Sequence, residues 1–319
     1  MQGFAKELKT KFAEELSSAA LEYIDLGRDL FHRHISSERD CMQSAIGTLG
    51  TGTELLLKSY IATHNLGAIF KDVPPEMRVF LSSLERVPQF FEWHNYAVNI
   101  RTEKYVTLDL KESVAGFFIF FPHMKQPMLP HINALIKRSD ACLHSVLPSL
   151  NMYEFERIGY AVINIIRALG HDKSFEASWL SLSEDDLAYM KRFEKNRHDR
   201  VRLAVLKAKK SSSKREHDHF DTVYAHDWNH HVAVCPVCRS QGLMEGYTVL
   251  AVGQDEDGFS SNLDFFATTY HCDECGLTLN DSEEMKLVKL DTIYDRSSEL
   301  DRWFAEHEDF SDWYLNGSM

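Results

Sequence analysis

The sequence has no long hydrophobic run. The longest one, from Val114 to Phe121, spans eight residues and ends at Pro122, whereas a helix needs about 20 apolar residues to cross a bilayer. The N-terminal residues 1–16 are amphipathic and charged, and they lack the apolar core of a signal peptide. We therefore expect a cytoplasmic protein without a membrane-spanning segment.

Cysteine is scarce, at six residues in 319, which excludes a disulfide-stapled fold. A hydrophobic fraction of 44% is instead that of a globular chain with a core. Four of the cysteines form two C-x-x-C pairs, and the other two stand alone in helix-like surroundings. The lone cysteines are Cys41 and Cys142. This distribution is typical of metal thiolates in a reducing compartment.

Positive charge is also limited, because 35 basic residues face 48 acidic ones and the net charge is −13. This balance argues against a general nucleic-acid coat. Residues 191–215 nevertheless hold eleven Lys or Arg against two acids, so RNA could bind locally. The residues predicted to contact RNA are Lys137, Arg192, Arg197 and Arg200. The alternative is a solvated helix face followed by a basic linker.

The first two thirds of the chain have helical periodicity. Apolar residues recur every three or four positions, which predicts helices over 4–30, 46–61, 130–148, 155–170 and 183–208. A further helix is expected at 76–92, and 104–121 is ambiguous between helix and strand. Gly47, Gly50 and Gly52 interrupt the second series, so they indicate either close helix packing or a break.

The pattern changes after Ser211 to Arg215, where short β-prone runs replace the helical repeat. These runs cover 231–234, 247–252 and 265–270, and short helices are expected near 281–288 and 297–307. The predicted organisation is a helical domain at 1–210, a linker at 211–230 and a β module at 231–319. The fold class is therefore an all-α bundle followed by a small β-containing module.

The two C-x-x-C pairs predict a metal site with the ligands Cys235, Cys238, Cys272 and Cys275. A C-x-x-C turn lets two thiolates reach one ion, and Gly276 supplies conformational freedom directly after the second pair. Two such knuckles joined by a β-prone insert are typical of a zinc ribbon, in which the insert forms its own hairpin. Four sulfur ligands leave no open position, so we expect one structural Zn²⁺ per chain.

Two alternatives to this ligand set remain. A redox-active dithiol is one, although it usually accompanies a βαβ pattern that this sequence lacks. Histidines before the first knuckle could also replace a cysteine or bind a second ion, or they could belong to a polar linker. These histidines are His217, His219, His226, His230 and His231. A zinc hydrolase is not indicated, because the sequence contains no H-E-x-x-H motif.

A second chemical segment runs from His131 to Ser145. Asp140 and His144 are four residues apart, so on a helix they share one face and the carboxylate could orient the imidazole. Arg138 is six residues before His144, about 120° away around an ideal helix. Other Arg-x5-His pairs occur at Arg28/His34 and Arg192/His198, and polar residues at a helix surface are the simplest explanation of such a spacing.

This Arg-x5-His segment and the upstream stretch 45–58, which contains Glu54, resemble the HEPN superfamily of helical proteins. Many members are metal-independent endoribonucleases of prokaryotic defence, toxin and CRISPR systems. The resemblance covers roughly residues 1–205. It implies that Arg138 polarises the scissile phosphate and that His144 acts as general acid or base in a 2′-OH attack. Ser139 stands where the family commonly has Asn.

The resemblance also implies a homodimer in which Arg138, Ser139, Asp140 and His144 line a shared RNA groove. Histidine titrates near neutrality, and arginine presents a permanently charged planar fork to phosphate. A protein partner from the same operon is expected in such systems. The competing function is a non-catalytic HEPN-like scaffold whose zinc ribbon binds a protein or nucleic acid, which the overall acidity favours.

Overall fold

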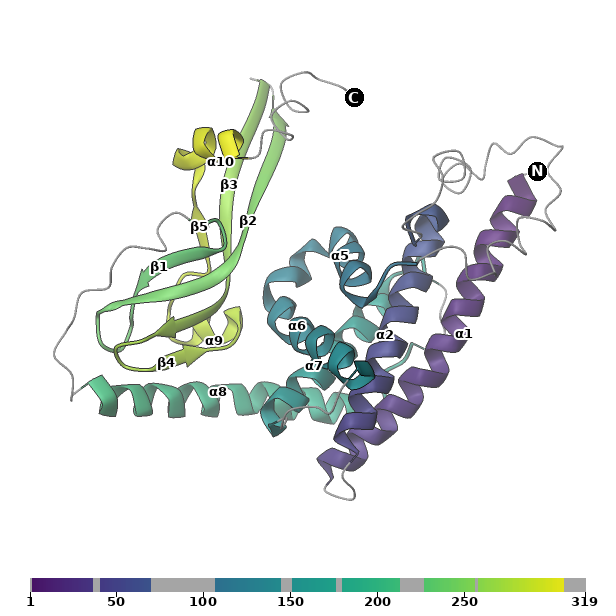
Figure 1. Ribbon diagram of the computed structural model, residues 1–319, viewed down its shortest axis with the longest axis horizontal. Coiled ribbons are helices and arrows are strands. Elements are labelled where there is room, and N and C mark those ends of the chain that lie inside the picture. The colour runs from purple at the N-terminus through teal and green to yellow at the C-terminus, as the bar shows by residue number, and fades with distance from the viewer. Residues whose placement is uncertain are drawn as a thin grey trace. The chain divides into compact units, whose positions relative to one another are not determined.

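The computed structural model describes residues 2–36, 41–69, 107–144, 151–175, 180–212, 227–255 and 258–306. The chain divides into two compact units, and each is described by itself. The helical unit comprises residues 1–125 and 131–193, and the ribbon unit comprises residues 126–130 and 194–319. The expected combination of many helices with a small antiparallel sheet near the C-terminus is confirmed (Figure 1).

The helical unit is built from amphipathic helices around one apolar core. Its elements are α1 (Gln2–Ile35), α2 (Met42–His64), the 3₁₀ helix η1 (Leu66–Ile69), α5 (Leu110–Phe120), α6 (Pro122–His144), α7 (Met152–His171) and the start of α8 (Glu184–Ser212). The largest fully buried side chains include Phe31, Tyr60, Phe117, Phe155 and Phe193. None of the described helices is long and apolar enough to cross a membrane.

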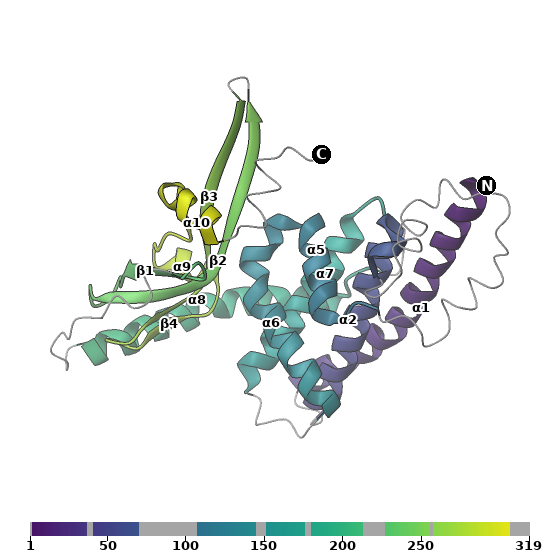
Figure 2. The same ribbon diagram turned by 45° about the horizontal axis from the view of Figure 1, so that its top comes forward.

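Glycines allow close approach between helices of this unit. Helices α1 and α2 lie side by side (Figures 1 and 2), and a Cβ placed on Gly52 of α2 would lie 2.7 Å from a side-chain carbon of Ile24. Gly50 faces α6 in the same way, since its Cβ would lie 2.6 Å from the Cβ of Ser139. The predicted packing role is confirmed for Gly50 and Gly52, whereas a Cβ on Gly47 would make only an ordinary contact of 3.8 Å with Cys142. Helix α2 continues through all three glycines without a break.

Two predicted boundaries differ from the structure. Helix α6 begins at Pro122, not near Pro130, because proline is compatible with a first turn, and the helix then accommodates Pro127 and Pro130 internally. The ambiguous stretch 104–121 contains helix α5. A reciprocal capping box starts this helix, in which Glu112 N donates to Asp109 Oδ1 at 2.9 Å. The helix expected at 76–92 lies outside the described residues.

Helix α8, expected from residue 183, starts at a reciprocal capping box between Ser183 and Asp186. Asp186 N donates to Ser183 Oγ at 3.1 Å, and Ser183 N donates to Asp186 Oδ2 at 2.9 Å. The boundary between the compact units falls inside this helix, between Phe193 and Glu194. The second part of α8 therefore belongs to the ribbon unit, and most of the linker expected at 211–230 lies outside the described residues.

The ribbon unit holds a five-stranded antiparallel sheet in the order β1-β2-β3-β4, with β5 also pairing with β3. Its elements are β1 (His230–Val234), β2 (Gln241–Asp255), β3 (Gly258–Cys272), β4 (Leu277–Leu279), α9 (Ser282–Leu287), β5 (Ile293–Asp295), η3 (Ser297–Glu299) and α10 (Leu300–Glu306). The insert between the cysteine pairs forms the predicted hairpin, in which β2 pairs with β3 along its length.

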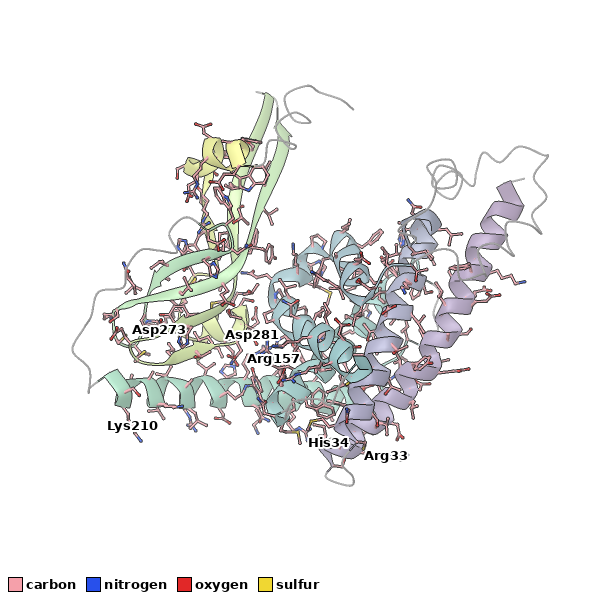
Figure 3. The ribbon with its side chains drawn as sticks, viewed as in Figure 1. Arg33, His34, Arg157, Lys210, Asp273 and Asp281 are labelled. Carbon is pink, nitrogen blue, oxygen red and sulfur yellow. The ribbon has the colours of Figure 1, made fainter. Side chains whose placement is uncertain are left out.

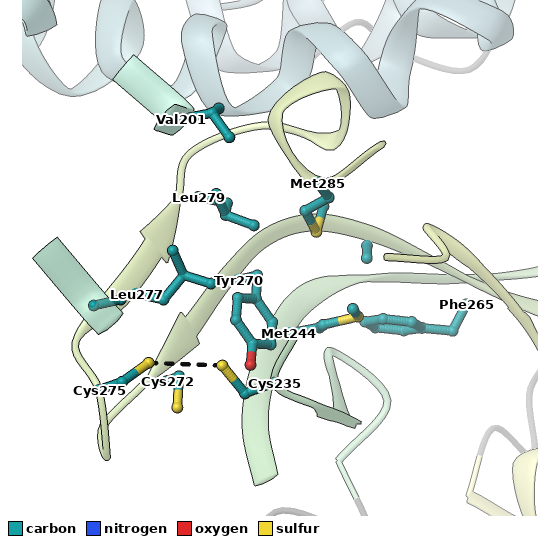
Figure 4. Packing of buried hydrophobic residues seen from close by; sticks show 12 residues of the cluster. Val201, Cys235, Met244, Phe265, Tyr270, Cys272, Cys275, Leu277, Leu279 and Met285 are labelled. Carbon is teal, nitrogen blue, oxygen red and sulfur yellow. Dashed lines mark hydrogen bonds between the residues drawn. The ribbon is translucent and has the colours of Figure 1, made fainter. Parts of the chain in front are cut away.

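One buried cluster joins the sheet, the cysteines and the second part of α8 (Figure 4). Val201 and Ala208, which are seven positions apart, lie on one face of α8 and enter this cluster at 6% and 1% exposure. The cluster is completed by Met244, Phe265, Ala267, Tyr270, Leu277, Leu279 and Met285 together with three of the cysteines. The cysteine site is thus part of the core of the ribbon unit.

Candidate metal centre

The two cysteine knuckles have matching backbone turns. Arg239 N donates to Cys235 O at 3.1 Å, and Gly276 N donates to Cys272 O at 2.8 Å. The residue after each C-x-x-C pair is left-handed, with φ of 71° at both Arg239 and Gly276. The first knuckle follows β1, while the second joins β3 to β4. The sheet therefore brings together two equivalent turns that are far apart in sequence.

The four sulfurs are separated by distances that suit one metal ion. All four lie within 4.8 Å of one another, and the Sγ–Sγ distances are 3.6 Å for Cys235–Cys275 and 3.6 Å for Cys238–Cys272. A tetrahedron with metal–sulfur bonds of about 2.3 Å has edges of about 3.8 Å. A disulfide would require about 2.05 Å. The donor set therefore fits a tetrahedral metal, and the four thiols are unbridged.

In the absence of a cation, burial disfavours the ionised, thiolate form of these cysteines. It raises the pKa of Cys272 to about 11 and that of Cys275 further. Burial also acts to raise the pKa of Cys235, but the backbone N–H groups of Cys238 and Val237 and the hydroxyl of Tyr270 outweigh it and bring the pKa down to about 7. Cys235 is thus prepared to ionise first, and a bound cation would allow the other thiols to deprotonate.

Arg239 carries a strain that Gly276 avoids, because a side chain at positive φ costs about 1 to 2 kcal/mol. We expect Arg239→Gly to stabilise the ribbon unit by about 1 kcal/mol. The measurement is the denaturant dependence of amide exchange in β2 and β3 of the metal-loaded chain. Ser240→Gly, one position later, is the matched control and should not stabilise. A lower stability for Arg239→Gly would contradict this interpretation of the first knuckle.

Histidine is not part of the four-sulfur group among the described residues. His230 Nδ1 lies 2.8 Å from Asp227 Oδ2, and the ring of His231 stacks on Tyr294 with centroids 3.9 Å apart. Both rings therefore have local partners in and around β1. The other three histidines considered as ligands, His217, His219 and His226, lie outside the described residues.

Two arginines predicted to contact RNA are directed into the ribbon unit. Arg197 Nε lies 3.7 Å from Asp281 Oδ2, and Arg200 Nε lies 3.4 Å from Glu284 Oε1. Both carboxylates are buried at α9, where Asp281 caps the helix. Asp281 is labelled in Figure 3. These ion pairs fasten α9 to α8. Of the other two predicted contacts, Lys137 is exposed on α6, and Arg192 is exposed beside the Tyr189 ring at 5.6 Å.

Arg138 makes a bidentate ion pair with Glu154 of α7. Its Nε and Nη2 donate to Oε1 and Oε2, both at 2.8 Å. The arginine side chain is 12% exposed, and Glu154 is 21% exposed. The hydrogen bonds from Glu154 raise the pKa of Arg138, so the guanidinium stays charged and its fork is occupied. The capping residue Asn151 positions Glu154, because the Glu154 backbone N–H donates to Asn151 Oδ1 at 2.8 Å.

The remaining residues of the Arg-x5-His segment have different environments. Ser139 is 5% exposed against Gly50 and is part of the α2–α6 packing. Asp140 is exposed on α6. His144 is the last residue of α6, and its side chain lies outside what the structure describes, so the predicted Asp140–His144 pair remains a prediction.

A buried carboxylate forms a second charged cluster that sequence reasoning did not identify. Asp186 is fully buried, and its oxygens accept from Arg28, from His32 at 2.9 Å and from the Ser183 hydroxyl at 2.8 Å. Burial lowers the pKa of His32; the charge of Asp185 opposes this shift, and that of Arg28 adds to it. The available signal was the i,i+4 spacing of Arg28 and His32 on α1. The cluster joins α1 to the start of α8.

Comparison with known proteins gives no relative for this chain: it matches no protein-family model, no curated protein and no solved structure.

Proposed function

We propose that this chain is a zinc-dependent binding protein, in which a four-cysteine zinc ribbon is carried by a helical scaffold. The observation that supports this most is the gathering of four thiol sulfurs within 4.8 Å in the ribbon core. Tetrahedral sulfur ligation is typical of zinc or of iron–sulfur centres. Two C-x-x-C knuckles in a small antiparallel sheet favour zinc. When bound, the ion would supply structural cross-linking and charge compensation, because four protein ligands close its coordination shell.

The proposal is tested by metal content. The full chain, purified without added metal, should contain one zinc per chain by elemental analysis and take up one Co²⁺ with thiolate-to-metal charge transfer. Cys235→Ser and Cys275→Ser should lose stoichiometric uptake. Cys41→Ser and Cys142→Ser, which change cysteines of the helical unit, are the matched controls and should retain it. Wild type without bound metal, or with iron in place of zinc, would contradict the proposal.

The charge of the ribbon favours a basic protein partner over a polyanion. Residues 227–306 contain 16 Asp or Glu and only 5 Lys or Arg, so phosphate groups would be repelled over most of this surface. The second part of α8 carries other basic side chains that are exposed, such as Lys195 and Lys207, but two of its arginines are paired with Asp281 and Glu284. The ribbon is therefore better suited to a surface rich in lysine and arginine, as expected from electrostatic complementarity.

A dimeric endoribonuclease using Arg138 and His144 is the second candidate. It is supported by the rigid orientation of Arg138, which Glu154 holds on the helix that ends at His144. The same ion pair favours the scaffold, because a phosphate would have to displace Glu154 before reaching the arginine fork. The RNA-contact role of Lys137 and Arg192 belongs to this candidate.

We expect the wild-type chain to leave RNA intact without added divalent metal, because the fork of Arg138 is occupied. The assay follows labelled single-stranded RNA by denaturing gel, with wild type, Arg138→Ala, His144→Ala and Glu154→Gln compared. Cleavage by wild type that disappears in both Arg138→Ala and His144→Ala would establish the nuclease and overturn the non-catalytic scaffold. Glu154→Gln removes the carboxylate charge that holds Arg138, and so tests whether this ion pair is what keeps the arginine from binding phosphate.

A further inference from the structure

The hydroxyl of Tyr270 is buried beside the cysteine cluster. Tyr270 lies on β3 two residues before Cys272, so both side chains point to the same face of the strand. The residue is 1% exposed, and its hydroxyl oxygen makes no hydrogen bond of normal geometry to any described residue. A buried hydroxyl is stabilised when an acceptor lies in good hydrogen-bond geometry to it. The position therefore calls for an acceptor.

The Tyr270 hydroxyl faces a cysteine sulfur. Figure 4 shows the Tyr270 ring between the core and the cysteines, with its oxygen directed toward the sulfur of Cys235. Gly242 on β2 makes room for this arrangement, because a Cβ there would lie 2.2 Å from the hydroxyl oxygen and 2.5 Å from the ring carbon that bears it. The strand backbone thus leaves a niche that fits a tyrosine hydroxyl and excludes larger residues at position 242.

We propose that Tyr270 donates an O–H···S hydrogen bond to the Cys235 thiolate in the metal-loaded protein, and so acts as a positioning residue of the metal centre. This inference rests on the proposed zinc site. A thiolate bound to a metal still carries negative charge and accepts hydrogen bonds, and outer-shell donors of this kind orient ligands and tune the metal. The bond would also give the buried hydroxyl a hydrogen bond of normal geometry.

The inference has two measurable consequences. Removing the donor should weaken metal binding by roughly 10-fold to 100-fold, the usual effect of losing an outer-shell partner. It should also leave the Cys235 sulfur richer in electrons, so the thiolate-to-Co²⁺ charge-transfer band should move to lower energy. A tyrosine that acts only through ring packing would produce neither change when replaced by phenylalanine.

The experiment uses the full chain with Tyr270→Phe, which keeps the ring and deletes the hydroxyl. Zinc affinity is measured by competition with a chelator of known affinity, and Co²⁺ uptake is followed by absorption. Tyr294→Phe is the matched control, since the Tyr294 hydroxyl donates to the Asp291 carbonyl at 3.0 Å, and it should behave as wild type. Gly242→Ala is a second variant that fills the niche and should shift the band in the same direction.

The outcomes separate the inference from the proposed function. Weaker affinity together with a shifted band in Tyr270→Phe supports the hydrogen bond. An unshifted charge-transfer band in Tyr270→Phe overturns the hydrogen bond, whether or not zinc affinity changes. If that variant still takes up metal stoichiometrically, the proposed zinc site stands. Absence of Zn²⁺ and Co²⁺ uptake by wild type overturns the zinc site itself, and the inference with it. If Tyr270→Phe does not fold, the band in Gly242→Ala decides.

Discussion

Removal of the metal should unfold the ribbon unit and leave the helical unit folded. Structural zinc contributes an apparent binding free energy of about 10 to 16 kcal/mol in zinc-finger peptides, which matches or exceeds the whole stability of a typical domain, about 5 to 15 kcal/mol. The cysteines are part of the same buried cluster as Tyr270 and Leu277. Without the ion the two cysteine knuckles are no longer joined to each other, so the core that packs β1 to β4 loses its cross-link.

Hydrogen exchange measured by mass spectrometry on the intact chain, with and without chelation, tests this expectation. Peptides from β2 and β3 should lose protection, while those from α2 and α7 should keep it. Helix α8 gives the sharpest readout. Its second part packs Val201 and Ala208 into the ribbon core, so 194–212 should lose protection while 184–193 retains it. Uniform loss along the whole chain, or unchanged protection in the ribbon, would contradict the account.

Asp186→Ala should destabilise the helical unit by about 3 to 5 kcal/mol, the usual cost of breaking a buried ion pair by removing one partner. The substitution leaves the guanidinium of Arg28, which is 15% exposed, without its buried acceptor. It also removes the two hydrogen bonds that the Ser183 N–H and hydroxyl donate to the Asp186 carboxylate at the first turn of α8. Both effects act on the junction between α1 and α8.

The measurement is urea unfolding of the metal-loaded chain followed by far-ultraviolet circular dichroism. Asp185→Ala is the matched control, because Asp185 is the exposed neighbour in the same turn, and surface changes usually stay within about 0.5 kcal/mol. Equal unfolding midpoints for the two variants would show that the buried cluster does not stabilise the unit. Asp186→Asn should give an intermediate loss, since it keeps hydrogen-bonding groups without the charge.

The features predictable from sequence are those set by local pattern. The helical repeat of α1, the capping box at Ser183 and the two C-x-x-C pairs each determine structure within a few residues. The hairpin between the cysteine pairs follows too, because two distant knuckles can share an ion only if the intervening chain returns on itself. These predictions needed no knowledge of long-range packing.

The features that were missed depend on contacts between distant segments. Glu154 and Arg138 are sixteen residues apart and meet only because α6 and α7 pack together. Asp186 meets Arg28 across more than 150 residues, and its place in the capping box of α8 gives no sign of this distant partner. The sequence around Arg197 and Arg200 does not distinguish them from solvent-exposed arginines. Their ion pairs depend on α9, which brings Asp281 and Glu284 next to them.

The HEPN-like interpretation of the helical unit also depends on contacts between distant segments. A motif of two residues at a spacing of six does not specify what surrounds them, and the surroundings decide whether an arginine can hold phosphate. Here the fork of Arg138 is bound by a carboxylate, and Ser139 is used for packing. The four cysteines form the stronger basis for function, since their mutual distances suit one ion.

The most direct test is X-ray absorption at the zinc edge of the full chain. The account predicts a first shell of four sulfurs at about 2.3 Å, with no nitrogen or oxygen ligand. A first shell containing a histidine nitrogen or water oxygen, or one with fewer than four sulfurs, would contradict the closed four-cysteine site.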